Sequence, residues 1–140
     1  MRLEIAQSQI AEIAQTGVKA FPEEACGLLI GRITDRAWHV ESVIPAENIA
    51  AASERHHRYT IDPKVFLHTQ RTAEAAGLEV VGFFHSHPNH PATPSTFDRE
   101  RAWGSYVYVI VHVTPNGAQE TTAWELVGEA MTPVKIDDLT

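Results

Sequence analysis

The sequence predicts an α/β or α+β fold with a mixed β-sheet, formed as one domain over residues 1–140. The first reason is that β-prone apolar runs alternate along the chain with segments whose apolar residues recur at helical spacing. The second is that 140 residues is a usual length for one domain and is enough for a substantial core. The third is that apolar residues make up 44% of the chain, close to the average of soluble globular proteins.

The first third of the chain predicts two strands that pair after an initial strand and helix. Ser8 suits the N-cap of that helix, and Phe21-Pro22 suits its end. Thr34-Asp35 suits the turn between the two paired strands. The expected elements are a short strand at 3–5, a helix over 8–21, a central strand over 25–33 and its antiparallel partner over 37–44.

The middle of the chain begins with a polar loop at 45–56, the best candidate for a mobile, partner-contacting segment. Asp62-Pro63 is typical of a helix start, because an N-cap precedes proline at the first helical position. Gly77 is placed to end this helix, and Gly82 indicates close backbone approach or a bulge within the next strand. The expected elements are a short strand at 57–61, a helix from 63 to 76 and a buried strand at 79–85.

The last third begins with a stiff loop, because three prolines lie between Pro88 and Pro94. Ser95 suits the N-cap of a short helix, and Asp98 lies at the third helical position, as in a capping box. Pro115-Asn116-Gly117 predicts a turn between two strands. The expected elements are a helix over 96–102, strands over 106–113 and 121–127, and a short strand near 134–136 before a frayed end.

The charge balance disfavours some partners. With 18 acidic and 11 basic residues, the formal net charge is −7, which argues against binding nucleic acid or an anionic membrane through overall charge. A local basic segment exists at Arg55-His56-His57-Arg58, where a solvated loop is the simpler interpretation. The single cysteine, Cys26, forms no disulfide within the chain, and no leader or spanning segment is evident, so we expect a cytoplasmic location.

Two histidines mark the candidate site. His85 and His87 end an apolar run, and residues two apart on a strand point to the same face. A carboxylate from another element would complete three protein ligands, and Asp98 fits because the proline-rich loop lets the chain reverse. Two histidines and a carboxylate leave a fourth tetrahedral position open, as in catalytic zinc sites, where the pKa of bound water falls to about 7.

Amide hydrolysis also needs a proton shuttle, and either Glu23 or Glu24 at the start of the central strand could supply it. Ser95 could donate a hydrogen bond to the oxyanion of the tetrahedral intermediate. Simpler interpretations exist for each residue alone. Capping explains Ser95 and Asp98 without a metal, the two glutamates could be a solvated strand entrance, and most His-x-His pairs bind nothing.

In combination, these residues resemble the motif of the JAMM (JAB/MPN-type) metalloprotease family. That motif is a glutamate on an early strand, then His-x-His, seven residues, a serine, two residues and an aspartate. The chain has Glu24-Ala25-Cys26-Gly27, then His85-Ser86-His87-Pro88, then Ser95-Thr96-Phe97-Asp98, with residues 88–94 as the seven. The resemblance extends to Pro45-Ala46-Glu47-Asn48 and to Tyr59-Thr60-Ile61-Asp62-Pro63.

The resemblance implies a cytidine-deaminase-like fold, in which a mixed β-sheet is flanked by helices. It implies that His85, His87 and Asp98 bind Zn²⁺, that Ser95 stabilises the oxyanion and that Glu24 is the general acid/base. Glu24 is preferred over its neighbour because the family's glutamate directly precedes the small residue-Cys-Gly run.

The chain is most similar to the prokaryotic single-domain branch that acts on ubiquitin-like sulfur-carrier proteins. This implies a zinc-dependent peptidase or isopeptidase that hydrolyses the amide bond after the carrier's C-terminal Gly-Gly through zinc-bound water. The extended tail is expected to lie beside an edge strand. The alternatives are a non-catalytic binding module for a ubiquitin-like partner and a metal-dependent hydrolase of a small amide. Whether His90 or the 45–56 loop contacts substrate stays open at this point.

Overall fold

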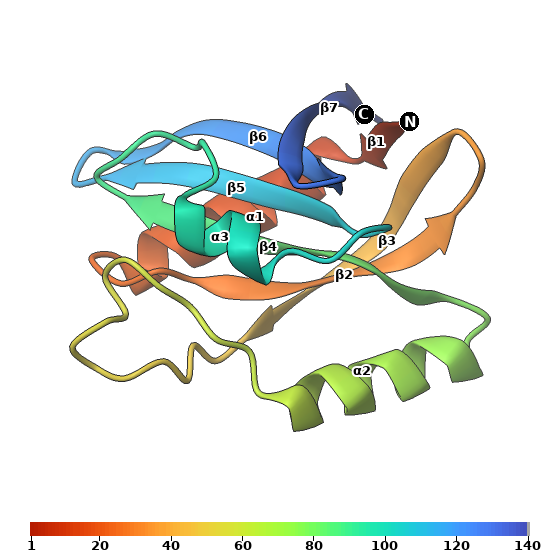
Figure 1. Ribbon diagram of the computed structural model, residues 1–140, viewed down its shortest axis with the longest axis horizontal. Helices are drawn as coiled ribbons and strands as arrows, with labels where there is room; N and C mark the ends of the chain where they lie inside the picture. Colours follow the sequence, from red (N-terminus) through yellow and green to blue (C-terminus); the bar gives the residue numbers. More distant parts are fainter. Residues whose placement is uncertain (140) are drawn as a thin grey trace.

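A computed structural model describes residues 1–139. The strands are β1 (Arg2–Ile5), β2 (Cys26–Ile33), β3 (Ala37–Ala46), β4 (Glu79–Pro88), β5 (Val107–Thr114), β6 (Gly117–Val127) and β7 (Ala130–Asp138). The helices are α1 (Gln7–Ala20), α2 (Pro63–Ala75) and α3 (Thr96–Arg101). The strands form one closed sheet in the order β1-β3-β2-β4-β5-β6-β7, with β7 returning to β1 (Figure 1).

The sheet is mixed. β1 is parallel to both β3 and β7, and β4 is parallel to β5, whereas the other neighbouring strands are antiparallel. The prediction of a mixed sheet flanked by helices is therefore confirmed. Closure of the sheet by β1 was not predicted, and a cytidine-deaminase-like assignment stays a prediction.

Successive side chains of a strand point to opposite faces of the sheet, and the buried apolar residues therefore form two clusters. Leu29 and Phe84 belong to the larger cluster, against which α1 packs through the buried Ile13. Leu28 belongs to the smaller cluster, which packs under α2 around Ala73. Because neighbouring residues of one strand join different clusters, the sheet contacts helices on both of its faces. In Figure 1, α2 lies below the strands and α1 lies on their other side.

Strands β4 and β5 approach closely at Gly82. A Cβ atom placed on Gly82 would lie 2.1 Å from the carbonyl oxygen of Val107, which is nearer than any side chain tolerates. The prediction that this glycine allows close backbone approach is confirmed. The paired residues of β4 and β5 run from this point, where Gly82 lies opposite Val107, to Pro88 opposite Val113.

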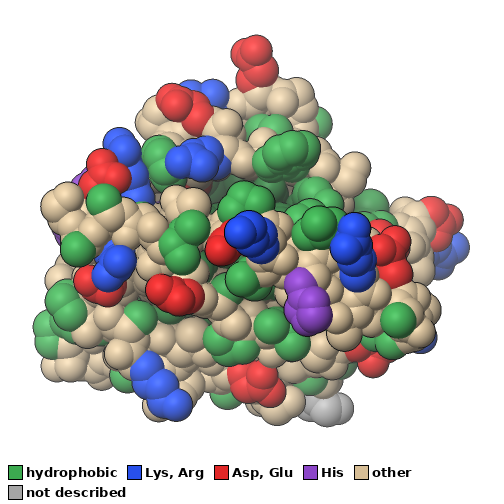
Figure 2. Space-filling view, turned by 90° about the horizontal axis from the view of Figure 1, so that it is seen from below, with side chains coloured by type: hydrophobic (Ala, Val, Ile, Leu, Met, Phe, Trp, Pro, Cys, Tyr) green, Lys and Arg blue, Asp and Glu red, His purple; other side chains and the backbone are tan. Residues whose placement is uncertain are grey.

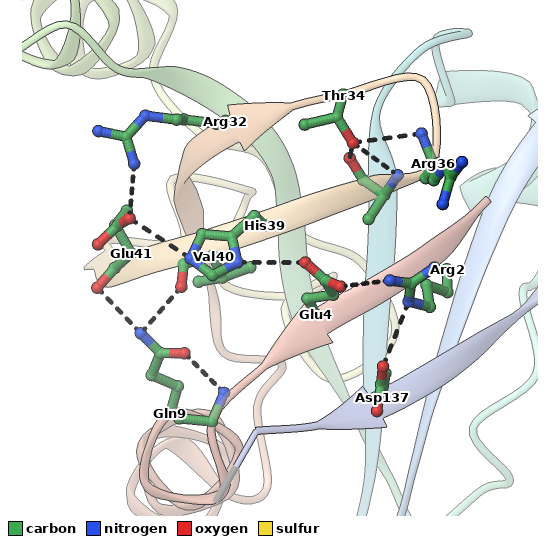
Figure 3. Close-up of polar contacts among 12 residues, drawn as sticks. Arg2, Glu4, Gln9, Arg32, Thr34, Arg36, His39, Val40, Glu41 and Asp137 are labelled. Carbon is green, nitrogen blue, oxygen red and sulfur yellow. Dashed lines mark hydrogen bonds and ion pairs between the residues drawn. The ribbon is translucent and has the colours of Figure 1, made fainter.

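Charged side chains support the closure at β1. The Arg2 guanidinium donates to Glu4 at 2.7 Å and to Asp137 at 3.2 Å, which links β1 to β7 (Figure 3). A ring nitrogen of His39 lies 3.4 Å from Glu4, and the other lies 3.4 Å from Glu41, so β3 joins the same network. These side chains are partly exposed, so each pair contributes at most about 1 kcal/mol.

The surface on the α2 side carries charges of both signs. Figure 2 views the molecule from below Figure 1, where apolar side chains are interspersed with lysine, arginine, aspartate and glutamate side chains. Among residues 1–139, none of the helices combines the length and the apolar character required to cross a membrane.

Several predicted boundaries are corrected. Ser8 is not the N-cap, because α1 begins at Gln7 and the Gln9 side chain accepts the hydrogen bond from the Ala6 N–H. Residues 57–61 form no strand, although their apolar residues alternate. β4 continues to Pro88, so both histidines lie within it, because β5 pairs with it to that point.

The prediction for the C-terminal segment is also corrected. It was expected to fray after a short strand near 134–136, but β7 runs over nine residues. It pairs with β6 on one side and with β1 on the other, which supplies main-chain hydrogen-bond partners on both sides.

Candidate active site

Strand topology brings the predicted site residues together. β2 is antiparallel to β4, so Cys26 at the start of β2 pairs with His85 near the end of β4. Glu24 lies just before β2 and therefore reaches the same end of the sheet as the two histidines. α3 lies over this end and brings Asp98, which follows the proline-rich loop (Figure 1).

Three side chains converge on one point. The Nε2 atoms of His85 and His87 lie 3.1 Å apart. Asp98 Oδ2 lies 3.1 Å from the first and 3.0 Å from the second. Both imidazoles are 1% exposed and the Asp98 side chain is 8% exposed, so the cluster is buried. Among residues 1–139, this is the one group of three or more such side chains placed to hold a metal ion.

The donor set fits a metal cation. The Nδ1 atom of His87 lies 2.8 Å from the carbonyl oxygen of Pro91, which can only accept, so Nδ1 carries the proton. The Nε2 atom of the neutral ring then presents its lone pair to the cluster, as metal-binding histidines do. A tetrahedral site with zinc–nitrogen bonds of 2.0–2.1 Å separates its donors by about 3.3 Å, close to the observed spacing. A lone pair facing a carboxylate oxygen is repulsive unless a cation lies between them.

Asp98 has two roles in the local structure. Its Oδ2 accepts from the Ser95 N–H at 2.9 Å, while its own N–H donates to Ser95 Oγ at 3.0 Å, so the predicted capping box of α3 is present. The same Oδ2 faces both histidines. Burial opposes ionisation of this carboxyl, but the charge of the His85 ring and the hydrogen bond from the Ser95 N–H hold its pKa well below the usual range. Burial lowers the pKa of His85.

Glu24 is almost fully buried, with 3% of its surface exposed, and its Oε1 atom has no hydrogen-bond partner among the described residues. Burial, reinforced by the negative charge of Asp98, raises the pKa of Glu24 to about 9. A buried carboxyl with a raised pKa is typical of groups that accept and donate protons near neutral pH. Its neighbour Glu23 is only half-buried.

Two aromatic rings flank the histidines. The Tyr59 ring stacks on His85, with 4.5 Å between centroids and 26° between planes. The His90 ring stacks on His87 at 4.3 Å. His90 is therefore neither a member of the three-ligand group nor a fully solvated loop residue.

A cavity of about 180 Å³ opens beside Asp98. Its wall includes Arg101, whose guanidinium carbon lies 4.6 Å from the centroid of Phe97, and Trp103, which is 71% exposed. A second, mostly apolar cavity of about 300 Å³ shares three lining residues with it. These shared residues are Ile61, Phe83 and Trp103. The two cavities are therefore adjacent, and together they are called the aromatic groove.

Sequence reasoning missed three residues at this site. Ser86 Oγ accepts from the Ala25 N–H at 2.7 Å, which holds the main chain next to Glu24. Asn48 binds the Glu24 carbonyl oxygen, and Tyr59 covers His85. Asn48 and Tyr59 lie in the two outlying segments of the JAMM resemblance, so their positions were visible but their contacts were not. Cys26 is buried, and burial raises its pKa to about 12.

The chain is similar to several known proteins. The model of the family described as prokaryotic homologues of the JAB domain matches residues 6–127. The chain is 39% identical over 104 residues to a protein of Haloferax volcanii named desampylase, covering 74% of this chain and 70% of that one. It is 36% identical over 89 residues to a probable TtuB-protein conjugate cleaving protease of Thermus thermophilus, covering 64% of this chain and 55% of that one.

Two solution structures share the fold. A protein of Desulfitobacterium hafniense is 27% identical and superposes with a TM-score of 0.85, covering 98% of this chain and 92% of that one. A protein of Salinibacter ruber is 32% identical and superposes with a TM-score of 0.73, covering 99% of this chain and 92% of that one.

Proposed function

The chain belongs to the family of prokaryotic homologues of the JAB domain, and from this premise we propose that it is a metal-dependent isopeptidase or peptidase. Its substrate would be a conjugate of a ubiquitin-like or sulfur-carrier protein, cleaved after the carrier's C-terminal Gly-Gly. The observation that carries the proposal is the convergence of His85, His87 and Asp98 beside the buried Glu24. The names of the relatives in Haloferax and Thermus support the substrate class.

We propose Zn²⁺ as the metal, held by His85, His87 and Asp98. Two imidazoles and one carboxylate suit zinc, and the donors fit a tetrahedral site with one position left open. A zinc ion bound there would supply Lewis acidity toward the scissile carbonyl and would lower the pKa of the attacking water. The hydrogen bond from His87 Nδ1 to Pro91 supports the assignment, because it fixes the tautomer that such a ligand needs.

The remaining chemistry is proton transfer. Beside a bound metal cation, the pKa of Glu24 would fall from its raised value in the metal-free protein. In the proposed mechanism, the Glu24 carboxylate then takes a proton from the attacking water and delivers it to the nitrogen of the departing amine. Its burial supports this role, because one carboxyl must be able to hold and release a proton near neutral pH. Ser95 Oγ already accepts from the Asp98 N–H, which leaves the hydroxyl proton free to donate to the oxyanion.

The aromatic groove supports an extended substrate tail. Gly-Gly has no side chains, so it can pass the narrow space next to Asp98, while larger residues upstream would contact Trp103 and Phe83. The expected addition of the tail to an edge strand stays a prediction. β1 pairs only with residues 37–39 of β3, so among the described residues, 1–139, positions 40–46 of that strand have a strand neighbour on one side alone. The single domain over 1–140 and the cytoplasmic location remain predictions.

The test is cleavage of a carrier–lysine conjugate by purified wild-type protein and Glu24→Gln, with zinc content measured in both. We expect stoichiometric zinc in each, and a loss of at least about 100-fold in kcat for Glu24→Gln, because general acid–base catalysis contributes that much or more. Normal cleavage by Glu24→Gln would refute the mechanism. Tight carrier binding without hydrolysis would favour the binding module, and turnover of small acylated amino acids alone would favour the small-amide hydrolase.

A further inference from the structure

The side-chain amide of Asn48 makes four hydrogen bonds. Its Nδ2 group donates to the carbonyl oxygens of Glu24 and Arg58, each at 3.0 Å. Its Oδ1 accepts from the N–H groups of Ala50 and Thr60, each at 3.1 Å. An asparagine amide has two donors and two acceptor lone pairs, so every one of them is used. A side chain with all four positions satisfied is held in one orientation.

The position of Asn48 follows from strand pairing. β3 ends beside the start of β2, where Ala46 pairs with Cys26, so the chain leaves β3 next to Glu24. Asn48 then joins Glu24 to both ends of the segment 50–60. The Glu24 N–H donates to the carbonyl oxygen of Arg55 at 2.7 Å, so this one segment and the asparagine that holds it bind both main-chain polar groups of Glu24.

The segment that Asn48 holds forms one side of the candidate site. Tyr59 stacks on His85, and the Arg58 guanidinium carbon lies 4.5 Å from the centroid of the Phe97 ring. Thr60 and Ile61 line the cavity beside Asp98. The hydrogen bonds of the Asn48 side chain go to none of the three proposed metal ligands.

We propose that Asn48 is a positioning residue that fixes Glu24 and one wall of the aromatic groove relative to the metal ligands. This inference rests on the proposed function, since the role of Glu24 is part of it. Asn48 sets the main chain on both sides of the site, whereas the Glu24 carboxyl has an oxygen with no partner of its own among the described residues. Small displacements of a catalytic group are costly, because about 1 Å of misplacement can lower a rate about 100-fold.

The test compares Asn48→Ala with Gln9→Ala, a matched control. The Gln9 amide likewise binds main-chain groups, those of Ala6, Val40 and Glu41, but it lies at the start of α1. We expect both variants to lose thermal stability. Only Asn48→Ala should lower kcat, by about 10- to 100-fold, with zinc affinity within about threefold of wild type. Equal kcat in the two variants would overturn the proposal.

A double-variant cycle separates positioning from a general structural role. If Asn48 acts through Glu24, adding Asn48→Ala to Glu24→Gln should lower the residual rate by less than about twofold. Multiplication of the two losses would overturn the proposal. Asn48→Asp keeps the size and both accepting bonds but places an oxygen against the Glu24 and Arg58 carbonyls. It should also lower kcat, and it serves if Asn48→Ala does not fold.

A readout independent of activity separates this proposal from the proposed function. In Asn48→Ala the amide hydrogens of Ala50 and Thr60 lose their acceptor, so their exchange with solvent should accelerate at least about tenfold. Unchanged exchange would overturn the inference even if the protein is an isopeptidase. A fully active Glu24→Gln, together with accelerated exchange in Asn48→Ala, would refute the mechanism instead.

Discussion

At the scale of single residues, the Asp98 carboxylate shows that a structural and a functional interpretation can both hold. Its Oδ2 caps α3 through the Ser95 N–H and also faces both histidines. Capping therefore does not argue against a metal at this position. It explains how a short helix aims one carboxylate oxygen at a fixed point, since the same hydrogen bond limits rotation of the Asp98 side chain.

The Glu24 carboxyl predicts how the stability of the metal-free protein depends on pH. In the unfolded chain it ionises near 4.5, whereas in the folded protein its pKa is about 9. Between these values the unfolded chain binds fewer protons, so this group lowers the free energy of unfolding as pH rises from about 4.5 to about 9. The titratable groups that interact with it electrostatically are Asp98, Cys26 and Tyr59.

Glu24→Gln removes this titration without changing the size of the side chain. In the presence of a chelator at pH 8, we expect its free energy of unfolding, measured by urea denaturation, to exceed that of wild type by about 1 kcal/mol or more, since one pKa unit is about 1.4 kcal/mol. The difference should shrink toward pH 5. A difference that stays constant over this range would show that Glu24 ionises normally in the folded protein.

At the scale of elements, β4 illustrates what local sequence can and cannot predict. The His-x-His spacing predicted two imidazoles on one face, and the structure has them there. The end of the strand was placed at residue 85 because Pro88 and the loop composition suggested a break. Pairing with β5 continues to Pro88, and that pairing depends on a strand that lies beyond α3 in the chain.

Residues 57–61 show the opposite error. The alternation of their side chains predicted a strand, but these residues instead form a loop whose side chains and main chain contact the site. Tyr59 packs on His85, and the Thr60 N–H binds Asn48. A period of two says only that alternate side chains face different surroundings, and here those surroundings are not the two sides of a sheet. The motif residues were predictable, whereas Asn48 and Ser86 act through main-chain contacts that no spacing reveals.

Gly82 provides a test of the contact between β4 and β5. Gly82→Ala would place a methyl group 2.1 Å from the Val107 carbonyl oxygen, so the two strands must separate. We expect a loss of about 2–3 kcal/mol in the free energy of unfolding, measured by urea denaturation, together with weaker zinc binding because both histidines lie on β4. Gly104→Ala is the matched control, because a methyl group added there would have nothing within 4 Å. Equal stabilities of the two variants would contradict the close approach.

At the scale of the whole molecule, closure of the sheet was beyond local patterns. Leu3 and Ile5 predicted a first strand, and residues near 134–136 predicted a last one. Neither segment's sequence indicates which strand it pairs with. The parallel pairing of Arg2 with Lys135 is a long-range contact, decided by how the intervening strands curve. Sequence therefore predicted most elements and the motif residues, but not the ring that the elements form.

Metal binding should stabilise the entire fold, because the proposed ligands come from two elements that pack together only in the folded protein. At a free zinc concentration about 100 times the Kd, binding adds about 2.7 kcal/mol to the free energy of unfolding. For a chain of this size, that raises Tm by about 10 °C, measured by scanning calorimetry with zinc and with chelator. His87→Ala should show no such rise, and an equal rise in His87→Ala would place the zinc elsewhere.

The pairing of β2 with β4 also determines when the site can exist during synthesis. Glu24 is translated well before His85, and α3 ends at Arg101, so an N-terminal fragment that stops before α3 holds the proposed proton shuttle without a complete ligand set. Contacts across such sequence distances form late, because the chain between them must first be ordered. A nascent chain would therefore acquire the proposed activity only after α3 has been made and packed, so a translation product truncated before α3 would be an inert protein rather than an unregulated protease.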